Sequence, residues 1–173
     1  ADLVVEGARV TGVVTQTGLG LKFSNLVISA AQGKLLLTLF YTMIAALILG
    51  MGLTTSAAYI LTAIIAAPAL IDLGVKPLVA HLFVFYYACL STITPPVALA
   101  SYAAAGIAEA PPFRVGYRAM WLAIVAYIVP YFFVYNPALL FQGPLWFIAF
   151  SFFTAIIGCM AIGSAVEGFV FAR

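Results

Sequence analysis

The sequence has very few charged side chains for its length. Only 7% of its 173 residues are Asp, Glu, Lys or Arg, whereas 66% are hydrophobic and 14% are aromatic. Soluble domains average about 25% charged residues. Disordered chains combine low hydrophobicity with many charges. The composition therefore excludes an ordinary soluble domain and a disordered chain, and it indicates a protein whose solvent is lipid.

Basic clusters and metal-ligand patterns are missing as well. Seven Lys and Arg against five Asp and Glu give a net charge of +2. They form no stripe that could follow a phosphate backbone, which excludes nucleic acid as a partner. The single histidine has no Cys or carboxylate at a catalytic or metal-ligand spacing, so we expect no enzyme and no catalytic residue. Cys89 and Cys159 lie in apolar stretches, where cysteine packs as a small hydrophobic side chain.

Long spans without Asp, Glu, Lys or Arg organise the chain. They are residues 35–71, 77–108 and 119–166. The charged segments between them predict loops in water. A bilayer core of about 30 Å needs about 20 helical residues, so the last span predicts two crossings, residues 119–141 and 144–166. Pro130 is expected to kink the first of these helices.

The span of residues 35–71 is too long for one helix, and a segment rich in Gly, Thr and Ser, residues 50–56, interrupts it. Its arms, residues 35–49 and 57–70, would each cover only about 22 Å as helices, which is too short for a crossing. A re-entrant helical hairpin fits better than two crossings. Such a hairpin places non-helical backbone at membrane depth, which is tolerated only where protein or a water-filled cavity surrounds it.

The span of residues 77–108 contains a second interruption, at Pro95 and Pro96. Two consecutive prolines remove two backbone donors and clash with the preceding turn, so the carbonyl groups of that turn are expected to lose their usual partners. The same prolines suit the first turn of a new half-helix. We therefore predict a discontinuous transmembrane helix with arms at residues 77–90 and 97–108.

These patterns predict an all-α, polytopic integral membrane protein with a re-entrant helical hairpin and a discontinuous transmembrane helix, an arrangement typical of ion transporters. The predicted regions are an N-terminal interfacial or partial helix region (residues 1–34), the hairpin (35–71), the broken helix (77–108) and two C-terminal transmembrane helices (117–173).

Two interruptions that carry small hydroxyl side chains favour a cavity-lining site of a secondary transporter. Carbonyl groups at half-helix C-termini, together with Ser and Thr hydroxyls, make an all-oxygen cage suited to a hard cation such as Na⁺. Half-helix N-termini offer N–H groups and positive partial charge to a carboxylate. The predicted sodium-binding residues are Gly50, Gly52, Ser91, Thr92, Thr94 and Val97. The predicted substrate-binding residues are Thr54, Thr55, Ser56, Pro95 and Pro96.

Other interpretations stay open. Small residues and prolines also occur in membrane helices that only pack or kink, so the chain could be a non-transporting structural or assembly subunit. The breaks could instead form the constriction of an ion channel. His81 lies close to Lys76 and is expected near the membrane interface rather than in a proton relay. The aromatic side chains could line a substrate path, but packing or a place near the headgroups is the favoured interpretation; they are Tyr127, Tyr131, Phe132, Phe133 and Tyr135.

Three pieces of the sequence carry a resemblance to a known family. They are Gly50-Met51-Gly52-Leu53, Ala57-Ala58-Tyr59-Ile60 and Ile93-Thr94-Pro95-Pro96-Val97-Ala98. With these pieces, residues 17–140 resemble the second repeat of the large permease subunit of TRAP transporters, in the fused permeases of the TAXI branch. In that family a hairpin and the following broken helix hold a sodium ion and flank the substrate; here these would be residues 35–70 and 77–108.

The resemblance implies a sodium-driven elevator transporter for small organic acids in the bacterial inner membrane. It implies sodium as the coupling ion and no other metal or cofactor. The implied partners are an extracytoplasmic substrate-binding protein, the organic anion substrate and the lipid bilayer. Since the first repeat of such permeases is not among these residues, the remaining half of the permease is a further expected partner.

Overall fold

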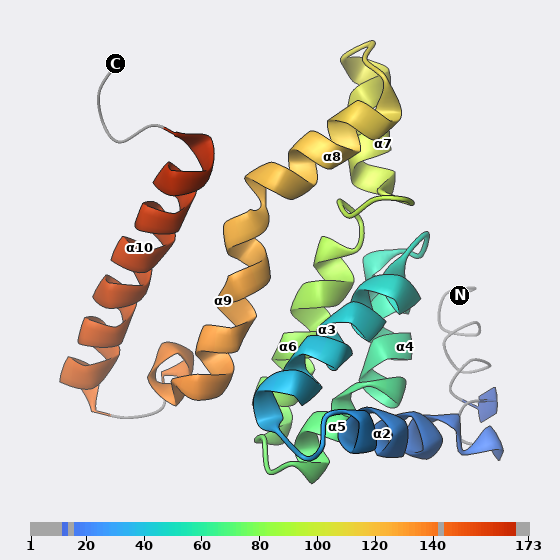
Figure 1. The fold of residues 1–173 in the computed structure, drawn as a ribbon, viewed down its shortest axis with the longest axis vertical. Coiled ribbons are helices and arrows are strands. Elements are labelled where there is room, and N and C mark those ends of the chain that lie inside the picture. The colour runs from blue at the N-terminus through green and yellow to red at the C-terminus, as the bar shows by residue number, and fades with distance from the viewer. Residues whose placement is uncertain (1–11, 14–15, 142–143, 169–173) are drawn as a thin grey trace.

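The computed structural model of the chain describes residues 12–13, 16–141 and 144–168 (Figure 1). Every regular element in this part of the chain is a helix, which confirms the predicted all-α class. The elements are α2 (Leu19–Ala30), α3 (Leu35–Gly50), α4 (Thr55–Ile65), α5 (Ala67–Asp72), α6 (Pro77–Leu90), α7 (Leu99–Ile107), α8 (Pro112–Leu122), α9 (Ile124–Tyr135), the 3₁₀ helix η1 (Pro137–Leu140) and α10 (Leu145–Glu167). Most of the predicted N-terminal region that precedes α2 lies outside the described residues.

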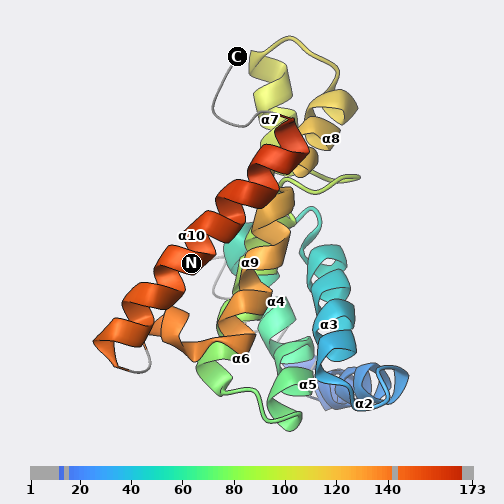
Figure 2. The ribbon, with the colours of Figure 1, turned by 60° about the vertical axis from the view of Figure 1, so that its left-hand side comes forward.

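Helices α3, α4 and α6 pack against one another, and α9 lies against α6 (Figure 2). The face of α3 that packs inward carries a small side chain at every fourth position: Thr38, Thr42, Ala46 and Gly50, all buried. Small residues let helix backbones approach closely, which is the main source of helix association where lipid replaces water. Large side chains from α6, among them the fully buried Phe83 and Tyr87, fill the space beside this face.

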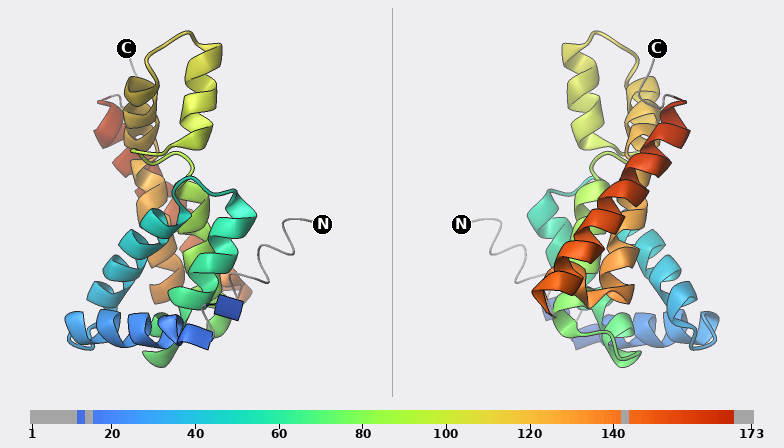
Figure 3. Two further views of the ribbon diagram at one scale, coloured as in Figure 1. Left: turned by 90° about the vertical axis from the view of Figure 1, so that its right-hand side faces the viewer. Right: turned by 90° about the vertical axis from the view of Figure 1, so that its left-hand side faces the viewer.

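Helix α2 lies across one end of this bundle (Figure 3). Helix α2 contacts both α4 and α5 near their junction. This junction divides residues 57–70, which the sequence predicted as one helix. Pro68 has no N–H to donate to the carbonyl of Ile64, so the helical ladder ends there. Gly20 of α2 lies on that carbonyl, because a Cβ at Gly20 would be 2.8 Å from the Ile64 oxygen.

The predicted crossing of residues 119–141 is wrong in its boundaries. The structure has two helices, α8 and α9, bent by 41° at Ala123. Helix α8 begins earlier than expected, at Pro112, since proline is preorganised for the first turn. The bend between the two helices falls at Ala123, where the N–H of Ala126 bonds the Ala123 carbonyl at 2.8 Å and tightens the helix, and α9 continues through Pro130. Helix α9 ends at Tyr135, and η1 follows it.

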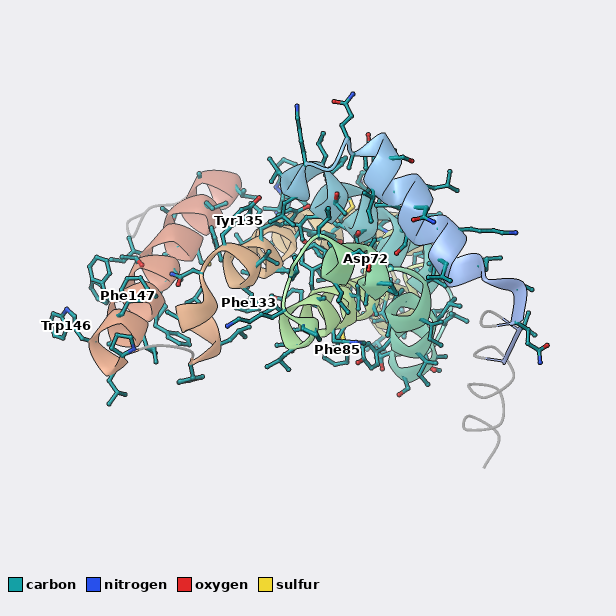
Figure 4. All side chains as sticks on the ribbon, turned by 90° about the horizontal axis from the view of Figure 1, so that it is seen from below. Asp72, Phe85, Phe133, Tyr135, Trp146 and Phe147 are labelled. Atoms are coloured by element: carbon teal, nitrogen blue, oxygen red, sulfur yellow. The ribbon has the colours of Figure 1, made fainter. Side chains whose placement is uncertain are left out.

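Helix α10 is the one described helix that is long and apolar enough to cross a bilayer alone, while α8 and α9 meet the same criterion together as a bent pair. The apolar helices α2, α3, α4 and α6 are shorter than a crossing requires. Helix α10 stands apart from the bundle, held at its start by a 3.0 Å hydrogen bond from Asn136 Nδ2 to Ser151 Oγ. Trp146 and Phe147 point outward from it (Figure 4), as expected for a lipid-facing surface.

Candidate functional site

The two interruptions of the helices meet at one place in the structure. An ideal Cβ added to Gly50 would lie 2.5 Å from Ser91 Oγ, a distance that real side chains do not reach. Residue 50 must therefore be glycine for the end of α3 to touch the segment after α6. At the neighbouring position, a Cβ on Gly52 would contact Cγ1 of Val97 at 3.4 Å. Four of the predicted sodium-binding residues are thus brought together by the fold.

Helix ends of both polarities converge on this contact. Helices α3 and α6 both end here, at Gly50 and Leu90, so their carbonyl ends bring negative partial charge to the same place. Helix α4 begins beside them at Thr55, and its first N–H to bond within the helix is that of Ala58, to the Thr54 carbonyl at 2.8 Å. The amides before Ala58 in α4 are the ones that an anion could use.

The hydroxyl groups of the second break all donate backward to the end of α6. Ser91 Oγ donates to the Ala88 carbonyl, and Thr92 Oγ1 to the Cys89 carbonyl, each at 2.7 Å. Thr94 Oγ1 donates to the Leu90 carbonyl, also at 2.7 Å. A hydroxyl has one proton and two lone pairs, so each oxygen that gives its proton to the helix keeps lone pairs for a cation.

The carbonyl groups before the prolines lose their usual partners, as expected, but three of them find other partners. The Leu90 carbonyl accepts from the N–H of Ile93, and the Ser91 carbonyl accepts from the N–H of Thr94. The Thr92 carbonyl accepts from the N–H of Ala100 at 3.0 Å, across the break. A tightened last turn and a bond across the loop supply these partners, so the hydroxyl oxygens are the better cation ligands in this segment.

The prolines do not open the second half-helix. Helix α7 begins at Leu99, after Ala98 as its N-cap, and Pro95 and Pro96 form a turn ahead of it, joined by a cis peptide bond. Tyr102 Oη donates to the Pro96 carbonyl at 2.5 Å and ties the turn to α7. The predicted substrate residues at Pro95 and Pro96 therefore belong to a turn, with Pro96 exposed.

The remaining predicted substrate residues lie at the tip of the hairpin. Thr54, Thr55 and Ser56 are all exposed, and Thr54 makes no side-chain cap hydrogen bond to α4. Their hydroxyl groups and the amides at the start of α4 lie on the same short segment. The tip can therefore offer both kinds of donor to a carboxylate from one direction.

One residue that contacts this site was not predicted. Tyr127, on α9, has its hydroxyl 2.5 Å from Thr94 Oγ1. Its backbone carbonyl accepts a 2.5 Å hydrogen bond from Tyr87 Oη of α6. We had expected Tyr127 to pack or to face headgroups. The sequence signal for this contact is the phenolic hydroxyl, because a buried tyrosine usually has a hydrogen-bond partner.

His81 also bridges two helices of the bundle. Its Nδ1 lies 3.3 Å from Tyr59 Oη, so the side chains join α6 to the arm α4. His81 is half-buried and its ring meets that of Tyr59 edge to face. This contact lies away from the two breaks, on the part of α6 nearer its start.

The two breaks contain no Asp or Glu, so every oxygen that they offer is formally neutral. Within the described residues, no group of three or more His, Cys, Asp or Glu could hold a metal ion. A cage of neutral oxygens suits a monovalent cation better than a divalent one, because no formal negative charge offsets the second positive charge. The donor set thus fits Na⁺.

Comparison with known families supports a transport role. The family model of the DctM component of tripartite ATP-independent periplasmic transporters matches residues 3–148. No curated protein and no solved structure matches the chain. Members of the matched family are transporter components rather than enzymes. The chain therefore belongs to the DctM family and is a permease component of a TRAP-type transporter, located in a membrane.

Proposed function

We propose that this chain couples sodium binding to the uptake of a small organic acid, as part of a TRAP-type permease in the bacterial inner membrane. The observation that carries the proposal is the meeting of the two helix breaks at Gly50 and Ser91. The proposal includes delivery of the acid by an extracytoplasmic substrate-binding protein and an elevator movement of the segment. Membership in the TAXI branch and a second permease half are part of the same proposal.

The sodium ion would bind between the ends of α3 and α6. Its ligands are the hydroxyl oxygens of Ser91, Thr92 and Thr94, with backbone oxygens at Gly50, Gly52 and Val97. The dipoles of both half-helices point their negative ends at this position, which stabilises a cation without a formal charge. Backbone and hydroxyl oxygens are the ligands that hard cations prefer.

The carboxylate of the substrate would bind at the hairpin tip. The amides at the start of α4 and the hydroxyls of Thr54, Thr55 and Ser56 are the donors. Positive partial charge at a helix N-terminus favours an anion there. The bound sodium lies on the same side of the molecule as this tip, and its charge favours the carboxylate further. Each ligand would therefore raise the affinity for the other, which is the requirement for symport.

Sodium-specific stabilisation tests the proposal directly. The chain, purified in detergent, is heated in NaCl and in KCl or choline chloride at equal ionic strength. Selective binding to the folded state stabilises it by RT ln(1 + [Na⁺]/Kd), about 2.7 kcal/mol when sodium is at 100 times its Kd. NaCl is expected to raise the thermal midpoint of unfolding, whereas KCl and choline chloride are not. If the midpoints agree in all three salts for the chain and for the assembled transporter, the sodium site does not exist.

Uptake by the assembled transporter separates the proposal from its competitors. Saturable uptake of an organic acid that collapses when sodium is replaced by choline supports a symporter. Sodium-independent conductance without saturation would instead identify a channel with its constriction at the breaks. A subunit that only packs against a partner would give neither signal.

A further inference from the structure

The hydroxyl of Thr94 is held by two partners from two different helices. It lies 2.7 Å from the Leu90 carbonyl of α6 and 2.5 Å from Tyr127 Oη of α9. The Leu90 carbonyl can only accept, so the Thr94 proton must point toward it. The proton of the second bond must then come from Tyr127. These assignments leave one lone pair on Thr94 Oγ1 and fix the direction in which it points.

The main chain of Tyr127 is also held in place by a hydrogen bond. Tyr87 Oη donates to the Tyr127 carbonyl at 2.5 Å, and Tyr87 is fully buried between α6 and α9. The backbone and the side-chain tip of Tyr127 are therefore both tied to the broken helix, at two separate points. A movement of α9 relative to α6 would have to break both bonds. The Tyr127 hydroxyl thus sets the orientation of Thr94 rather than following it.

We infer that Tyr127 is a positioning residue of the cation site: its hydroxyl donates to Thr94 Oγ1 and aims the remaining lone pair of that oxygen at the sodium ion. This inference rests on the proposed sodium site. Tyr127 acts through Thr94, to which its proton is committed. Without the Tyr127 hydroxyl, the Thr94 side chain can rotate about χ1. Sodium binding must then fix the orientation of Thr94 Oγ1, and this ordering lowers the affinity for sodium.

Tyr127→Phe tests the inference, with Tyr135→Phe as a matched control. Tyr135 lies about two turns further along α9, and its side chain is exposed. The measurement is the sodium concentration that gives half of the maximal thermal stabilisation of the purified transporter assembly, at constant ionic strength with choline chloride. Loss of one intramolecular hydrogen bond predicts that Tyr127→Phe raises this concentration by about three- to tenfold. Tyr135→Phe is expected to leave it unchanged.

A double variant separates positioning from a general loss of structure. Because Tyr127 acts through the Thr94 hydroxyl, Tyr127→Phe should add nothing to the sodium shift already caused by Thr94→Val. Additive shifts would overturn the inference. If Tyr127→Phe does not give folded protein, Tyr87→Phe replaces it, since this change removes the bond to the Tyr127 carbonyl and keeps the Tyr127 hydroxyl. It is expected to raise the half-maximal sodium concentration, and no change would overturn the inference.

The outcomes distinguish this inference from the function on which it rests. If the parent protein shows no sodium-specific stabilisation, the proposed sodium site fails and the role of Tyr127 fails with it. If the parent responds to sodium and Tyr127→Phe responds at the same concentrations, only the role of Tyr127 is wrong. A shift in Tyr127→Phe that Tyr135→Phe reproduces would also overturn it, because the effect would then belong to α9 as a whole.

Discussion

At the scale of single residues, the site needs a glycine, which has no side chain, as much as it needs residues with hydroxyl groups. Gly50 contributes only backbone atoms, and this is why Ser91 can lie against it. Ser91, Thr92 and Thr94 contribute hydroxyls whose protons are directed away, onto helix carbonyls. The result is a set of oxygen lone pairs beside a backbone that can approach closely.

Gly50→Ala is expected to separate the two breaks. The new Cβ would meet both Oγ and Cβ of Ser91, at 2.5 and 2.9 Å, so one of the two segments must shift. Overpacking of this kind costs about 1–3 kcal/mol, and the displaced backbone should also lose its sodium response. Thermal unfolding of the variant in NaCl and in KCl measures both effects. Gly106→Ala is the control, since nothing lies within 4 Å of a Cβ at Gly106.

Thr94→Val is expected to weaken sodium coupling while expression stays intact. Valine has the shape of threonine without the hydroxyl, so the loop keeps its packing and loses one oxygen ligand. The Leu90 carbonyl still accepts from the N–H of Ile93, which limits the cost to folding. Uptake by the assembled transporter, measured against sodium concentration, gives the result. Unchanged sodium dependence would remove Thr94 from the site.

At the scale of elements, prolines interrupt the helices at two places, and the structure deals with each break differently. At Pro95 and Pro96 the chain leaves the helix and forms a turn before α7. At Pro68 the chain continues almost at once as α5, and α2 lies against the carbonyl of Ile64. The first break leaves a loop beside the site, and the second provides a docking point for α2.

Gly20→Ala should detach α2 from this docking point. A Cβ at Gly20 would lie 2.8 Å from the Ile64 oxygen, and this backbone atom cannot rotate away as a side chain could. We expect a loss of about 1–3 kcal/mol in stability and faster proteolysis between α2 and α3. Gly158→Ala in α10 is the comparison, because a Cβ there meets nothing within 4 Å. Equal proteolysis of the two variants would show that the contact does not hold α2.

At the scale of the whole molecule, cation and anion sites that lie close together must influence each other. The proposed function places sodium at the ends of α3 and α6 and the carboxylate at the tip before α4. A transported acid is then expected to lower the sodium concentration needed for half-maximal stabilisation. Sodium must lower the Kd of that acid by the same factor, because the coupling free energy is reciprocal.

Titration of the assembled transporter with a panel of small carboxylates checks this prediction. Each acid is titrated with and without sodium, and sodium is titrated with and without the acid. For a substrate, the factor by which the acid lowers the half-maximal sodium concentration equals the factor by which sodium lowers the Kd of the acid. An acid that is taken up but shows no coupling in either direction would contradict the placement of both ligands at one site.

Much of the architecture could be predicted from the sequence because it depends on local chemistry. The scarcity of charge indicated lipid as solvent, and the ends of α3 and α6 lie beside the glycines and prolines that mark the interruptions. The start of α8 could not be placed in this way, since it lies in the charged segment of residues 109–118 that predicts a loop, whereas long arginine side chains can leave an amphipathic helix toward water. The bend at Ala123 has no sequence signal comparable to a proline.

The sequence by itself determined the solvent, the helical class and the positions where helices must stop, because these follow from composition and from the backbone chemistry of Gly and Pro. Only the tertiary structure decided that Gly50 meets Ser91 and that Tyr127 reaches Thr94. The physical reason is that helices in lipid are apolar on nearly every side, so the periodic contrast that marks a buried face is lost. Which faces meet is then decided by close packing and by single hydrogen bonds between distant parts of the chain.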